Sequence, residues 1–439
     1  MLDWLREHEH RTGTKEGCRA GDCGACTVVA GELADDGGLV FRPVDSCITP
    51  LVTIDGLALW TVEDLACPDG DLHPVQRAII DHHATQCGFC TPGVVMSLFA
   101  LYQQHMSGAR AAPRLVSRSD AVTALAGNLC RCTGYQPILD AAEAMVGYPP
   151  MTVDETALVD LLRSIQPSRD LESVLRSRRD RPQAVVVAGG TDVMVDAEAL
   201  GTELVDVVLL RGVPELTGVE DDGDRLVIGA AVPLEDAWAA LARERPGLSD
   251  YARRFGGPQV RGAGTLGGNI VTGSPVGDSM PVLLALGATL RLASLDTARE
   301  VPLGDFVVGY RSTDLRPDEL LVAIVVPHPR PGELFFARKH SRRHDDDISA
   351  VSLAVRLVER NGLVADASVG VGGAAAVPCR APETEAALVN RPWSWASACD
   401  AAEVLRRELD PIDDVRASAR HRRDELAALL RSGWDGARS

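Results

Sequence analysis

Eight of the chain's 11 cysteines fall into two sets of four, and their spacing limits the possible folds more than any other feature of the sequence. The first set is Cys18, Cys23, Cys26 and Cys47, and the second is Cys87, Cys90, Cys130 and Cys132. Four thiols are the ligand set of a structural zinc ion or of a 2Fe–2S cluster. The other cysteines are isolated, and we expect them to be small buried side chains: Cys67, Cys379 and Cys399.

The first set has the spacing of plant-type 2Fe–2S proteins. Three of its cysteines share the loop EGCRAGDCGACTV as C-x4-C-x2-C, and the fourth follows at residue 47. Zinc sites more often consist of two short cysteine pairs, so the spacing favours iron–sulfur over zinc. Gly17, Gly21 and Gly24 would let the loop adopt positive φ angles around the sulfurs. The flanking segments CTVVAGEL and GLVFRPVDSC are predicted strands, the second ending at Cys47.

The second set consists of two short cysteine pairs. QCGFC carries a C-x2-C pair, and CRC carries a C-x-C pair that is too tight for an ordinary disulfide. Helices are predicted on both sides of each pair, over residues 71–84, 91–104, 119–128 and 137–146. Each pair should therefore lie at a turn between two helices, and packing of the helices would bring the pairs together. The spacing alone favours a second cluster and leaves zinc as the alternative.

The second half of the chain contains glycine-rich turns that suit phosphate binding. RPQAVVVAGGTDVMVD, residues 181–196, indicates a turn, a buried strand and a glycine turn. Farther on, G-x-G-x-x-G occurs at Gly262, Gly264 and Gly267. No strand is predicted before it, and the glycines and prolines of 268–281 should forbid a helix after it, so we reject a Rossmann motif. Backbone amides of such loops can still bind a pyrophosphate, and tight structural turns are the alternative.

Length and charge narrow the class of protein. The 439 residues are too many for one core, so several domains are expected. A net charge of −18 argues against nucleic acid or an anionic membrane as the partner. The sequence shows neither an apolar run long enough to span a membrane nor a signal-peptide core near Met1, so we expect a cytoplasmic protein. Toward the C-terminus, 351–372 is a predicted hairpin and 410–430 a predicted helix.

Several motifs resemble those of one enzyme family. TGTKEGCRAGDCGACTV, QCGFCTPG and NLCRCTGY, in this order, resemble the iron–sulfur part of the xanthine oxidase family of molybdenum hydroxylases. The resemblance implies that all eight clustered cysteines are 2Fe–2S ligands and that Gln86 lies near the pterin of a molybdenum cofactor. Residues 107–119 look like an extra loop. In that family the first domain begins with a β-hairpin, whereas MLDWLR begins within the following helix, so two strands are expected to be absent.

VVAGGTDV and GTLGGNIVTGSPVGD resemble the FAD domain that this family shares with flavoproteins of the vanillyl-alcohol-oxidase (PCMH) type. The resemblance implies FAD contacts at Val186, Val187, Ala188, Gly189, Gly190, Thr191, Asp192, Val193, Phe255, Thr265, Leu266, Gly267, Gly268, Asn269, Asp278, Leu321 and Lys339. Judged from the residues alone, Leu321 would be a core leucine, and both Lys339 and the acidic run 345–347 would be solvated.

The resemblance covers nearly the whole chain and implies a multidomain α+β fold. The expected order is a plant-type ferredoxin (β-grasp) domain over 1–66, a four-helix 2Fe–2S domain over 67–150, an FAD domain over 165–330 and a C-terminal α+β domain over 333–436. It further implies an electron-transfer small subunit that links a large molybdenum-cofactor subunit, through two 2Fe–2S clusters and FAD, to NAD. Xanthine would be the substrate, and the assembly would hold two copies of each subunit.

Three other functions stay open at this point. The chain could serve a molybdenum hydroxylase for another N-heterocycle or for an aldehyde, or it could be a stand-alone flavin–iron–sulfur reductase. It could also be a zinc-stabilised interaction protein, which would contain no iron.

Overall fold

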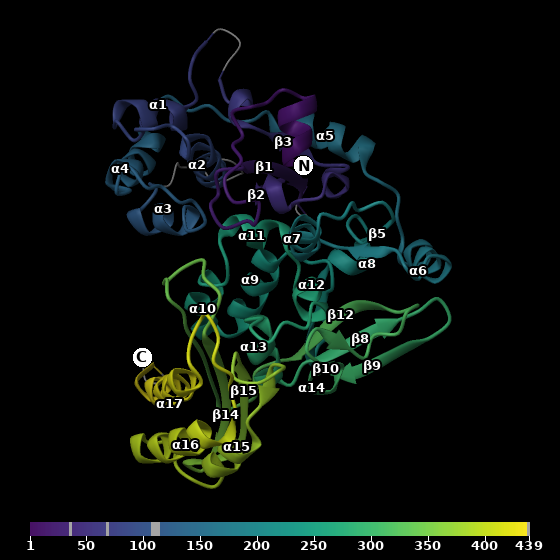
Figure 1. Ribbon diagram of the computed structural model, residues 1–439, viewed down its shortest axis with the longest axis vertical. Helices are drawn as coiled ribbons and strands as arrows, with labels where there is room; N and C mark the ends of the chain where they lie inside the picture. The colour runs from purple at the N-terminus through teal and green to yellow at the C-terminus, as the bar shows by residue number, and fades with distance from the viewer. Residues whose placement is uncertain (35–36, 67–69, 107–114, 437–439) are drawn as a thin grey trace. The chain divides into compact units, whose positions relative to one another are not determined.

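The structure is a computed structural model that describes residues 1–34, 37–66, 70–106 and 115–436 (Figure 1). Cys67 and residues 107–114 of the expected extra loop lie outside the described residues. The chain forms two compact units. Unit 1 contains Met1–Ser168, Val187–Gly212 and Gly256–Gly264, and unit 2 contains Arg169–Val186, Val213–Phe255 and Thr265–Ser439. The predicted multidomain α+β class is confirmed.

A small antiparallel sheet begins unit 1. Its strands are β1 (Thr27–Leu33), β2 (Leu39–Asp45) and β3 (Ala58–Trp60), in the order β2-β1-β3. A short helix, η1 (Trp4–His8), precedes them, and 3-10 turns follow at η2 (Ser46–Ile48), η3 (Leu51–Ile54) and η4 (Val62–Asp64). Both strands predicted around the first cysteine loop are present. Cys47 lies in η2 rather than at the end of β2, because pairing with β1 stops at Asp45.

Four helices follow in unit 1, as the sequence predicts: α1 (Pro74–Asp81), α2 (Thr91–Met106), α3 (Arg118–Ala124) and α4 (Gln136–Ala144). The central one, α2, is buried from Gly93 to Gln103 and packs against β1 and β2. It has no polar face because other elements surround it, which is the usual reason for an apolar helix in a globular core. The 3-10 turn η5 (Met145–Gly147) ends the group.

The rest of unit 1 comes from later parts of the chain. It includes the helices α5 (Glu155–Ile165), α7 (Thr191–Leu200) and α11 (Pro258–Ala263), and the strand β5 (Val207–Leu209), which pairs with β4 (Val185–Val187). Helix α11 packs on β2, and a Cβ at Gly262 would lie 2.7 Å from the carbonyl oxygen of Pro43. The predicted strand and glycine turn at 181–196 are present, but the sequence reasoning missed α7, which starts directly after Gly190.

Unit 2 contains a five-stranded sheet with the order β6-β7-β12-β8-β9. The strands are β6 (Val219–Asp221), β7 (Arg225–Gly229), β8 (Thr289–Ala293), β9 (Ala298–Pro302) and β12 (Leu320–Pro327). The helices of this part are α6 (Leu171–Asp180), α8 (Pro214–Thr217), α9 (Leu234–Glu244), α10 (Ser249–Arg253), α12 (Leu266–Val271), α13 (Ser279–Leu286) and α14 (Leu303–Phe306). The turn η6 (Pro246–Leu248) and the hairpin of β10 (Val307–Gly309) and β11 (Ser312–Thr313) complete it.

The expectation that no helix follows the G-x-G-x-x-G motif is wrong. Helix α12 forms over six residues, and the Thr265 hydroxyl accepts a hydrogen bond from the Gly268 amide at its first turn. Close packing explains why glycine is tolerated there, because a Cβ at Gly267 would lie 2.5 Å from the Ala230 carbonyl oxygen. A helix, α11, precedes the motif instead of a strand, so the motif still lacks the strand-to-helix context of a Rossmann fold.

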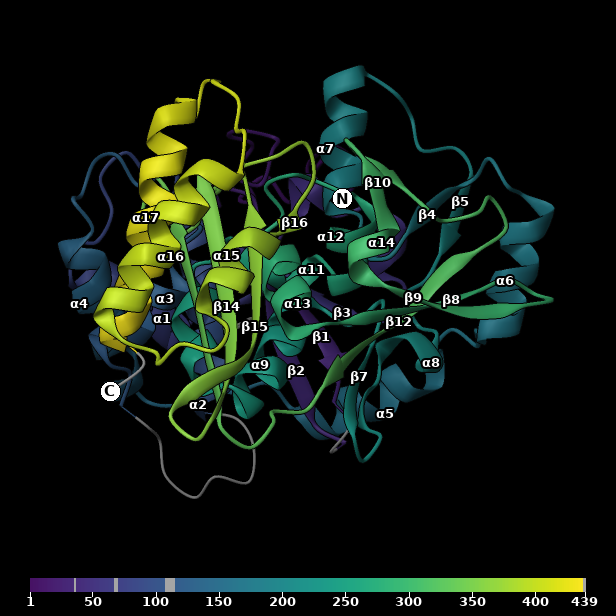
Figure 2. The ribbon, with the colours of Figure 1, turned by 90° about the horizontal axis from the view of Figure 1, so that it is seen from below.

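The C-terminal part of unit 2 is a four-stranded antiparallel sheet with the order β13-β14-β15-β16. Its strands are β13 (Glu333–His340), β14 (Val351–Arg360), β15 (Leu363–Gly372) and β16 (Cys379–Arg380), and the helices α15 (Pro382–Leu388), α16 (Trp395–Glu408) and α17 (Ala419–Gly436) accompany them (Figure 2). The predicted hairpin is confirmed as β14–β15. Its first strand is buried on both faces because α13 and α17 both pack on it. The last helix begins at Ala419, not near 410.

No helix among the described residues is long and apolar enough to cross a membrane.

Candidate cofactor sites

The first cysteine set forms one group of sulfurs in unit 1. The Cys26 and Cys47 sulfurs lie 3.3 Å apart, and the Cys18 thiol is hydrogen-bonded to both the Cys23 and the Cys47 thiols. The amides of Ala20 and Asp22 donate to the Cys18 sulfur at 3.4 and 3.3 Å. Backbone amides that point at a sulfur stabilise its thiolate form. Four thiols therefore come together at this loop, and backbone hydrogen bonds stabilise the thiolate form of at least one of them, Cys18.

The four thiols have strongly divided pKa values. Hydrogen bonding from the Cys23 thiol lowers the pKa of Cys18 far below its usual range, and the Cys47 thiol lowers the pKa of Cys26 to about 7. The pKa values of Cys23 and Cys47 are raised, in both cases first by the neighbouring Cys18 sulfur. Some pKa values are raised and others lowered in this way when several sulfurs lie within hydrogen-bond distance of one another. A bound metal would stabilise all four as thiolates, so the donor set fits a metal cluster.

Two of the three loop glycines take the positive φ angles that the sequence suggested. Gly21 has φ 75° and Gly24 has φ 64°. Gly24 also has no room for a side chain, because a Cβ would lie 2.4 Å from Nδ2 of Asn128. Gly17 has no positive φ among the described residues; instead, a Cβ there would lie 2.7 Å from the Cys23 sulfur. Gly17 therefore leaves space for the Cys23 sulfur, which differs from the expectation.

The second cysteine set also comes together in unit 1. Cys87 and Cys90 lie between α1 and α2, and Cys130 and Cys132 lie between α3 and α4, as predicted. The thiols pair crosswise, Cys87 with Cys132 and Cys90 with Cys130. Burial is the main cause that raises the pKa of Cys90 to about 12. Gln86 is exposed directly before this group.

Two residues near this set were not named from the sequence as part of a site. Burial by itself would raise the pKa of the Cys130 thiol, but hydrogen bonds to Thr133, whose hydroxyl lies 3.2 Å from the sulfur, lower it. The Tyr135 hydroxyl accepts from the Cys130 amide at 2.8 Å. Both residues belong to the motif NLCRCTGY. Their position next to the cysteines in this motif was the sequence signal that could have identified them.

The two cysteine sets are joined by hydrogen bonds within unit 1. The Leu129 amide donates to the Cys23 carbonyl at 3.0 Å, and Leu129 directly precedes Cys130. The side-chain amide of Asn128 donates to the Gly24 carbonyl at 3.0 Å. Fully buried Gln259 donates to Asn128 Oδ1 at 2.9 Å and to the Ser97 hydroxyl at 2.8 Å. The backbone of Cys23 in the first set is therefore hydrogen-bonded to the residue that directly precedes Cys130 of the second set.

The residues expected to contact FAD divide between the two units, and each part is described alone. In unit 1, Val187 ends β4, Ala188–Gly190 connect it to α7, and Gly190 takes φ 78° at the N-terminus of the helix. A Cβ at Gly189 would lie 1.9 Å from the Ala263 carbonyl oxygen, and one at Gly190 would lie 2.4 Å from Pro50. In the described structure no side chain caps this end of α7, so its amides can bind an anionic group such as a pyrophosphate.

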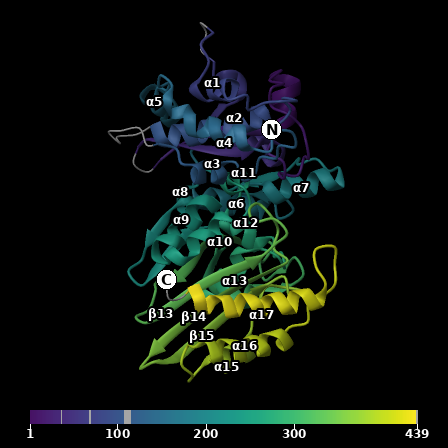
Figure 3. The same cartoon turned by 90° about the vertical axis from the view of Figure 1, so that its left-hand side faces the viewer.

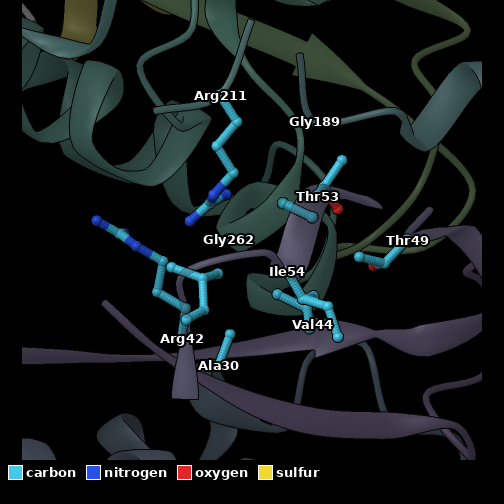
Figure 4. Close-up of a pocket in the computed structure, with 11 residues that line it drawn as sticks. Ala30, Arg42, Val44, Thr49, Thr53, Ile54, Gly189, Arg211 and Gly262 are labelled. Carbon is cyan, nitrogen blue, oxygen red and sulfur yellow. The ribbon is translucent and has the colours of Figure 1, made fainter. Parts of the chain in front are cut away.

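A pocket beside Gly189 is too small for a cofactor. Figure 4 shows Arg42 and Arg211 converging above Gly262, and both guanidinium groups bind Glu32, at 2.9 and 3.0 Å. The cavity has a volume of about 10 Å³, which is room for one water molecule. A larger cavity of about 530 Å³ lies along α7, lined among others by Pro50, Leu51, Val187 and Met194. Its size is that of a small-molecule site.

In unit 2, Thr265–Asn269 form the start of α12, and the Asn269 side-chain oxygen accepts from the Ser279 hydroxyl at 2.5 Å. Phe255 packs on Trp238, with ring centroids 5.7 Å apart. Leu321 is a buried core residue in β12. Its buried position fits the ordinary role of an apolar side chain in a sheet.

Lys339 is not solvated, contrary to what its residue type suggested. Its ammonium lies 2.6 Å from Oδ2 of Asp278, and its side chain is 1% exposed. It also donates to the carbonyl oxygens of Arg254 and Asp347, at 3.1 and 2.9 Å. The Ser349 hydroxyl donates to the other Asp278 oxygen at 2.6 Å. Two of the residues expected to contact FAD therefore form a buried ion pair with each other.

The acidic run 345–347 is not a solvated turn either. Asp346 is buried, and the Asp347 carboxylate accepts from the Arg343 amide at 2.8 Å. The Asp347 carbonyl oxygen of the same segment accepts a hydrogen bond from Lys339, so the run is part of the structure around the ion pair.

Family models match three successive parts of the chain. A [2Fe-2S] binding domain matches residues 61–143, an FAD binding domain in molybdopterin dehydrogenase matches 162–329, and a CO dehydrogenase flavoprotein C-terminal domain matches 336–437. The chain therefore carries, in this order, matches to a [2Fe-2S] binding domain, to an FAD binding domain and to a flavoprotein C-terminal domain.

Individual proteins are similar to the chain over most of its length or over a large part of it. Xanthine dehydrogenase of Drosophila pseudoobscura pseudoobscura is 33% identical over 93% of this chain and 35% of its own length. The chain spans about a third of the length of the curated relatives it matches. Reconstituted CO dehydrogenase from Oligotropha carboxidovorans is 26% identical, with a TM-score of 0.56 over 60% of this chain and 94% of that chain. Quinoline 2-oxidoreductase from Pseudomonas putida 86 is 26% identical, with a TM-score of 0.57 over 62% and 94%.

Proposed function

We propose that the chain is the electron-transfer small subunit of a xanthine dehydrogenase, which connects a molybdenum-cofactor subunit to NAD. The observation that carries the proposal is the hydrogen bond from the Leu129 amide to the Cys23 carbonyl, because it joins two four-thiol sites into one structure. When bound, two 2Fe–2S clusters supply one-electron transfer and FAD supplies conversion of two electrons into a hydride. The eight clustered cysteines would hold the clusters.

Contacts within unit 1 support an order for these proposed sites. The segment after Cys47 reaches the predicted flavin loop, since Pro50 packs against Gly190 and η2 packs against α7. The first cysteine set is therefore the one beside Val187–Val193, and the second set is reached through Leu129. Fixed backbone contacts of this kind position cofactors without chemical participation by the protein.

The second cysteine set faces the surface, which supports a partner subunit at this place. Gln86, Cys87 and Cys132 are exposed, and Phe89 and Leu129 beside them are 48% and 44% exposed. Exposed apolar side chains next to ligands are typical of a surface that another protein covers. We assign this surface to the large molybdenum-cofactor subunit, with two copies of each subunit in the assembly.

The residues expected to contact FAD would bind the cofactor. In unit 1, the uncapped N-terminus of α7 would offer amides to an anionic group such as the pyrophosphate. In unit 2, taken by itself, the start of α12 at Thr265–Asn269 would offer a polar backbone segment. Phe255, Asp278, Leu321 and Lys339 would surround the nucleotide in unit 2. The ion pair between Asp278 and Lys339 would fix the shape of this part rather than carry a proton.

The test is co-expression with a candidate large subunit, followed by iron analysis, EPR and an assay of purines with NAD. We expect about four Fe per chain, two EPR signals on reduction, and xanthine-dependent formation of NADH only when both chains are present. Activity with another N-heterocycle or with an aldehyde, and none with xanthine, would show that the substrate is not xanthine. Zinc at the cysteines without iron would overturn the proposal.

A second candidate is a stand-alone flavin–iron–sulfur reductase, and it makes a different prediction. Such a chain would bind no large subunit and would pass electrons from NADH to a separate acceptor protein. Exposure of Gln86, Phe89 and Leu129 around the second cysteine set favours the first proposal, because a stand-alone reductase needs no permanent apolar contact there.

A further inference from the structure

Two histidines and a glutamate meet at the edge of the C-terminal sheet, away from every residue discussed above as a ligand. His340 is the last residue of β13, and His421 and Glu425 lie one turn apart on α17. Figure 3 shows α17 lying along this sheet, and the helix packs against β13 and β14. The ligating atoms of the three side chains all lie within 4.8 Å of one another. The cluster therefore joins the last helix to the edge strand.

The distance between the two imidazoles suits a tetrahedral metal ion. Nε2 of His340 and Nε2 of His421 lie 3.2 Å apart, and the rings are inclined by 70°. Two Zn–N bonds of about 2.1 Å at a tetrahedral angle place their nitrogens about 3.4 Å apart. The rings would need to move by only a few tenths of an ångström to share one ion.

The Glu425 carboxylate faces the Nδ1 atoms of both imidazole rings. Its carboxylate lies 3.2 Å from Nδ1 of His340 and 3.9 Å from Nδ1 of His421. A carboxylate beside Nδ1 favours a proton on that nitrogen, and it leaves the Nε2 lone pair for a metal. One glutamate thus orients both imidazoles so that the two Nε2 atoms converge.

Without a metal, the Nε2 atoms of His340 and His421 share one hydrogen bond, to which either ring can supply the proton. The contact that brings the two nitrogens together is therefore already present before a cation binds.

We propose that His340 and His421 bind a Zn²⁺-class divalent cation through their Nε2 atoms, with Glu425 as the carboxylate that positions them and water completing the coordination. Imidazole ligands favour zinc, copper and nickel over magnesium or calcium. The ion would link α17 to β13. Lys339 and His340 are neighbours in a strand, so their side chains point to opposite faces, and the ion would leave the Lys339–Asp278 pair undisturbed.

The experiment measures Zn²⁺ binding to the intact iron- and flavin-containing protein after treatment with EDTA and gel filtration. Zinc and iron are counted together by mass spectrometry, and affinity is measured by isothermal titration calorimetry. We expect one zinc per chain in addition to unchanged iron. His340→Ala and His421→Ala should each lose this binding by at least tenfold. The matched control is His344→Asn, because His344 is 64% exposed and pairs only with Asp345 in the described structure.

A second variant keeps the test decisive if the alanine variants unfold. Glu425→Gln retains both imidazoles and should weaken zinc binding roughly 10- to 100-fold, the usual effect of removing the carboxylate behind a metal-bound histidine. Flavin absorbance should be the same with and without zinc. Equal zinc binding in the wild type, Glu425→Gln and both alanine variants would overturn the proposal, as would no zinc binding in the wild type.

Discussion

Replacement of Lys339 by methionine should destabilise the protein because it leaves a buried carboxylate without its counter-charge. Methionine keeps most of the apolar stem, so the loss is mainly electrostatic. The Asp278 side chain is 7% exposed and, among the residues that the structure describes, would retain only the Ser349 hydroxyl at 2.6 Å as a side-chain partner. Removing one partner of a buried ion pair usually costs about 3–5 kcal/mol. For a unit of this size that corresponds to a fall in melting temperature of about 10 °C.

The chain supplies a matched control. Only two of its 44 basic residues are lysines, and the other is Lys15, whose ammonium donates to the Thr12 carbonyl at 2.7 Å and has no carboxylate within ion-pair distance in the described structure. Lys15→Met removes the same charge from the protein without exposing a buried partner. Thermal unfolding is followed by tryptophan fluorescence, since Trp238 lies in the core of unit 2. Both variants are measured with FAD bound and after FAD removal.

The two measurements separate a structural role from a flavin contact. If the ion pair holds unit 2 together, Lys339→Met loses stability with or without FAD. The double variant Lys339→Met/Asp278→Asn should recover part of the loss, because it removes the unpaired charge. If Lys339 serves only to bind FAD, flavin affinity falls and the flavin-free protein melts within about 2 °C of Lys15→Met. That result would refute the structural reasoning.

Three further outcomes follow from the geometry. Cys130→Ser should abolish one of the two EPR signals of the reduced protein and stop electron flow from the molybdenum subunit to FAD, while NADH oxidation by artificial flavin acceptors continues; loss of both signals would show that the sites depend on each other. Gly24→Ala should lower iron to about two per chain, because its Cβ would overlap the Asn128 side chain at a φ of 64°, whereas Gly223→Ala, with φ 75° and open space, should keep all the iron. A hydrogen bond to Asp221 and the charge of Glu244 raise the pKa of His328, so its stabilising charge is complete below about pH 6.5 and is lost as pH rises through the raised pKa. The melting temperature of the wild type should therefore fall relative to His328→Gln between about pH 6 and pH 8, and parallel curves would contradict the assignment.

The elements around the cysteines could be predicted from the sequence because local signals there agree with the final packing. The four helices of 74–144 begin at recognisable signals such as His73–Pro74 and Ser117, which cap α1 and α3. The cysteine pairs were placed correctly at the turns between these helices. The thiols of the two pairs also meet, as packing of the helices was expected to make them do.

The flavin region shows where local signals fail. The glycines and prolines of 268–281 argued against a helix, but α12 forms over Leu266–Val271 and packs so closely on Ala230 that Gly267 has no room for a side chain. Lys339 looked solvated because its carboxylate partner, Asp278, lies 61 residues earlier. Asn128 and Gln259 were not found for the same reason, because they meet across 131 residues. Long-range polar pairs have no periodicity, so a single sequence contains no pattern that reveals them.

Two glycines are tightly packed beside the segments that carry the cysteine sets. A Cβ at Gly93, in the first turn of α2, would lie 2.0 Å from the Gly24 carbonyl oxygen, and one at Gly127 would lie 2.2 Å from Oε1 of Gln259. A larger side chain at Gly93 would therefore press on the loop that carries Cys23, and one at Gly127 would displace the Gln259 side chain that donates to Asn128. In the proposed relay, the four cysteines of each set would determine the chemical identity of its cluster. The glycines would ligate nothing and would permit the packing around the Leu129–Cys23 contact.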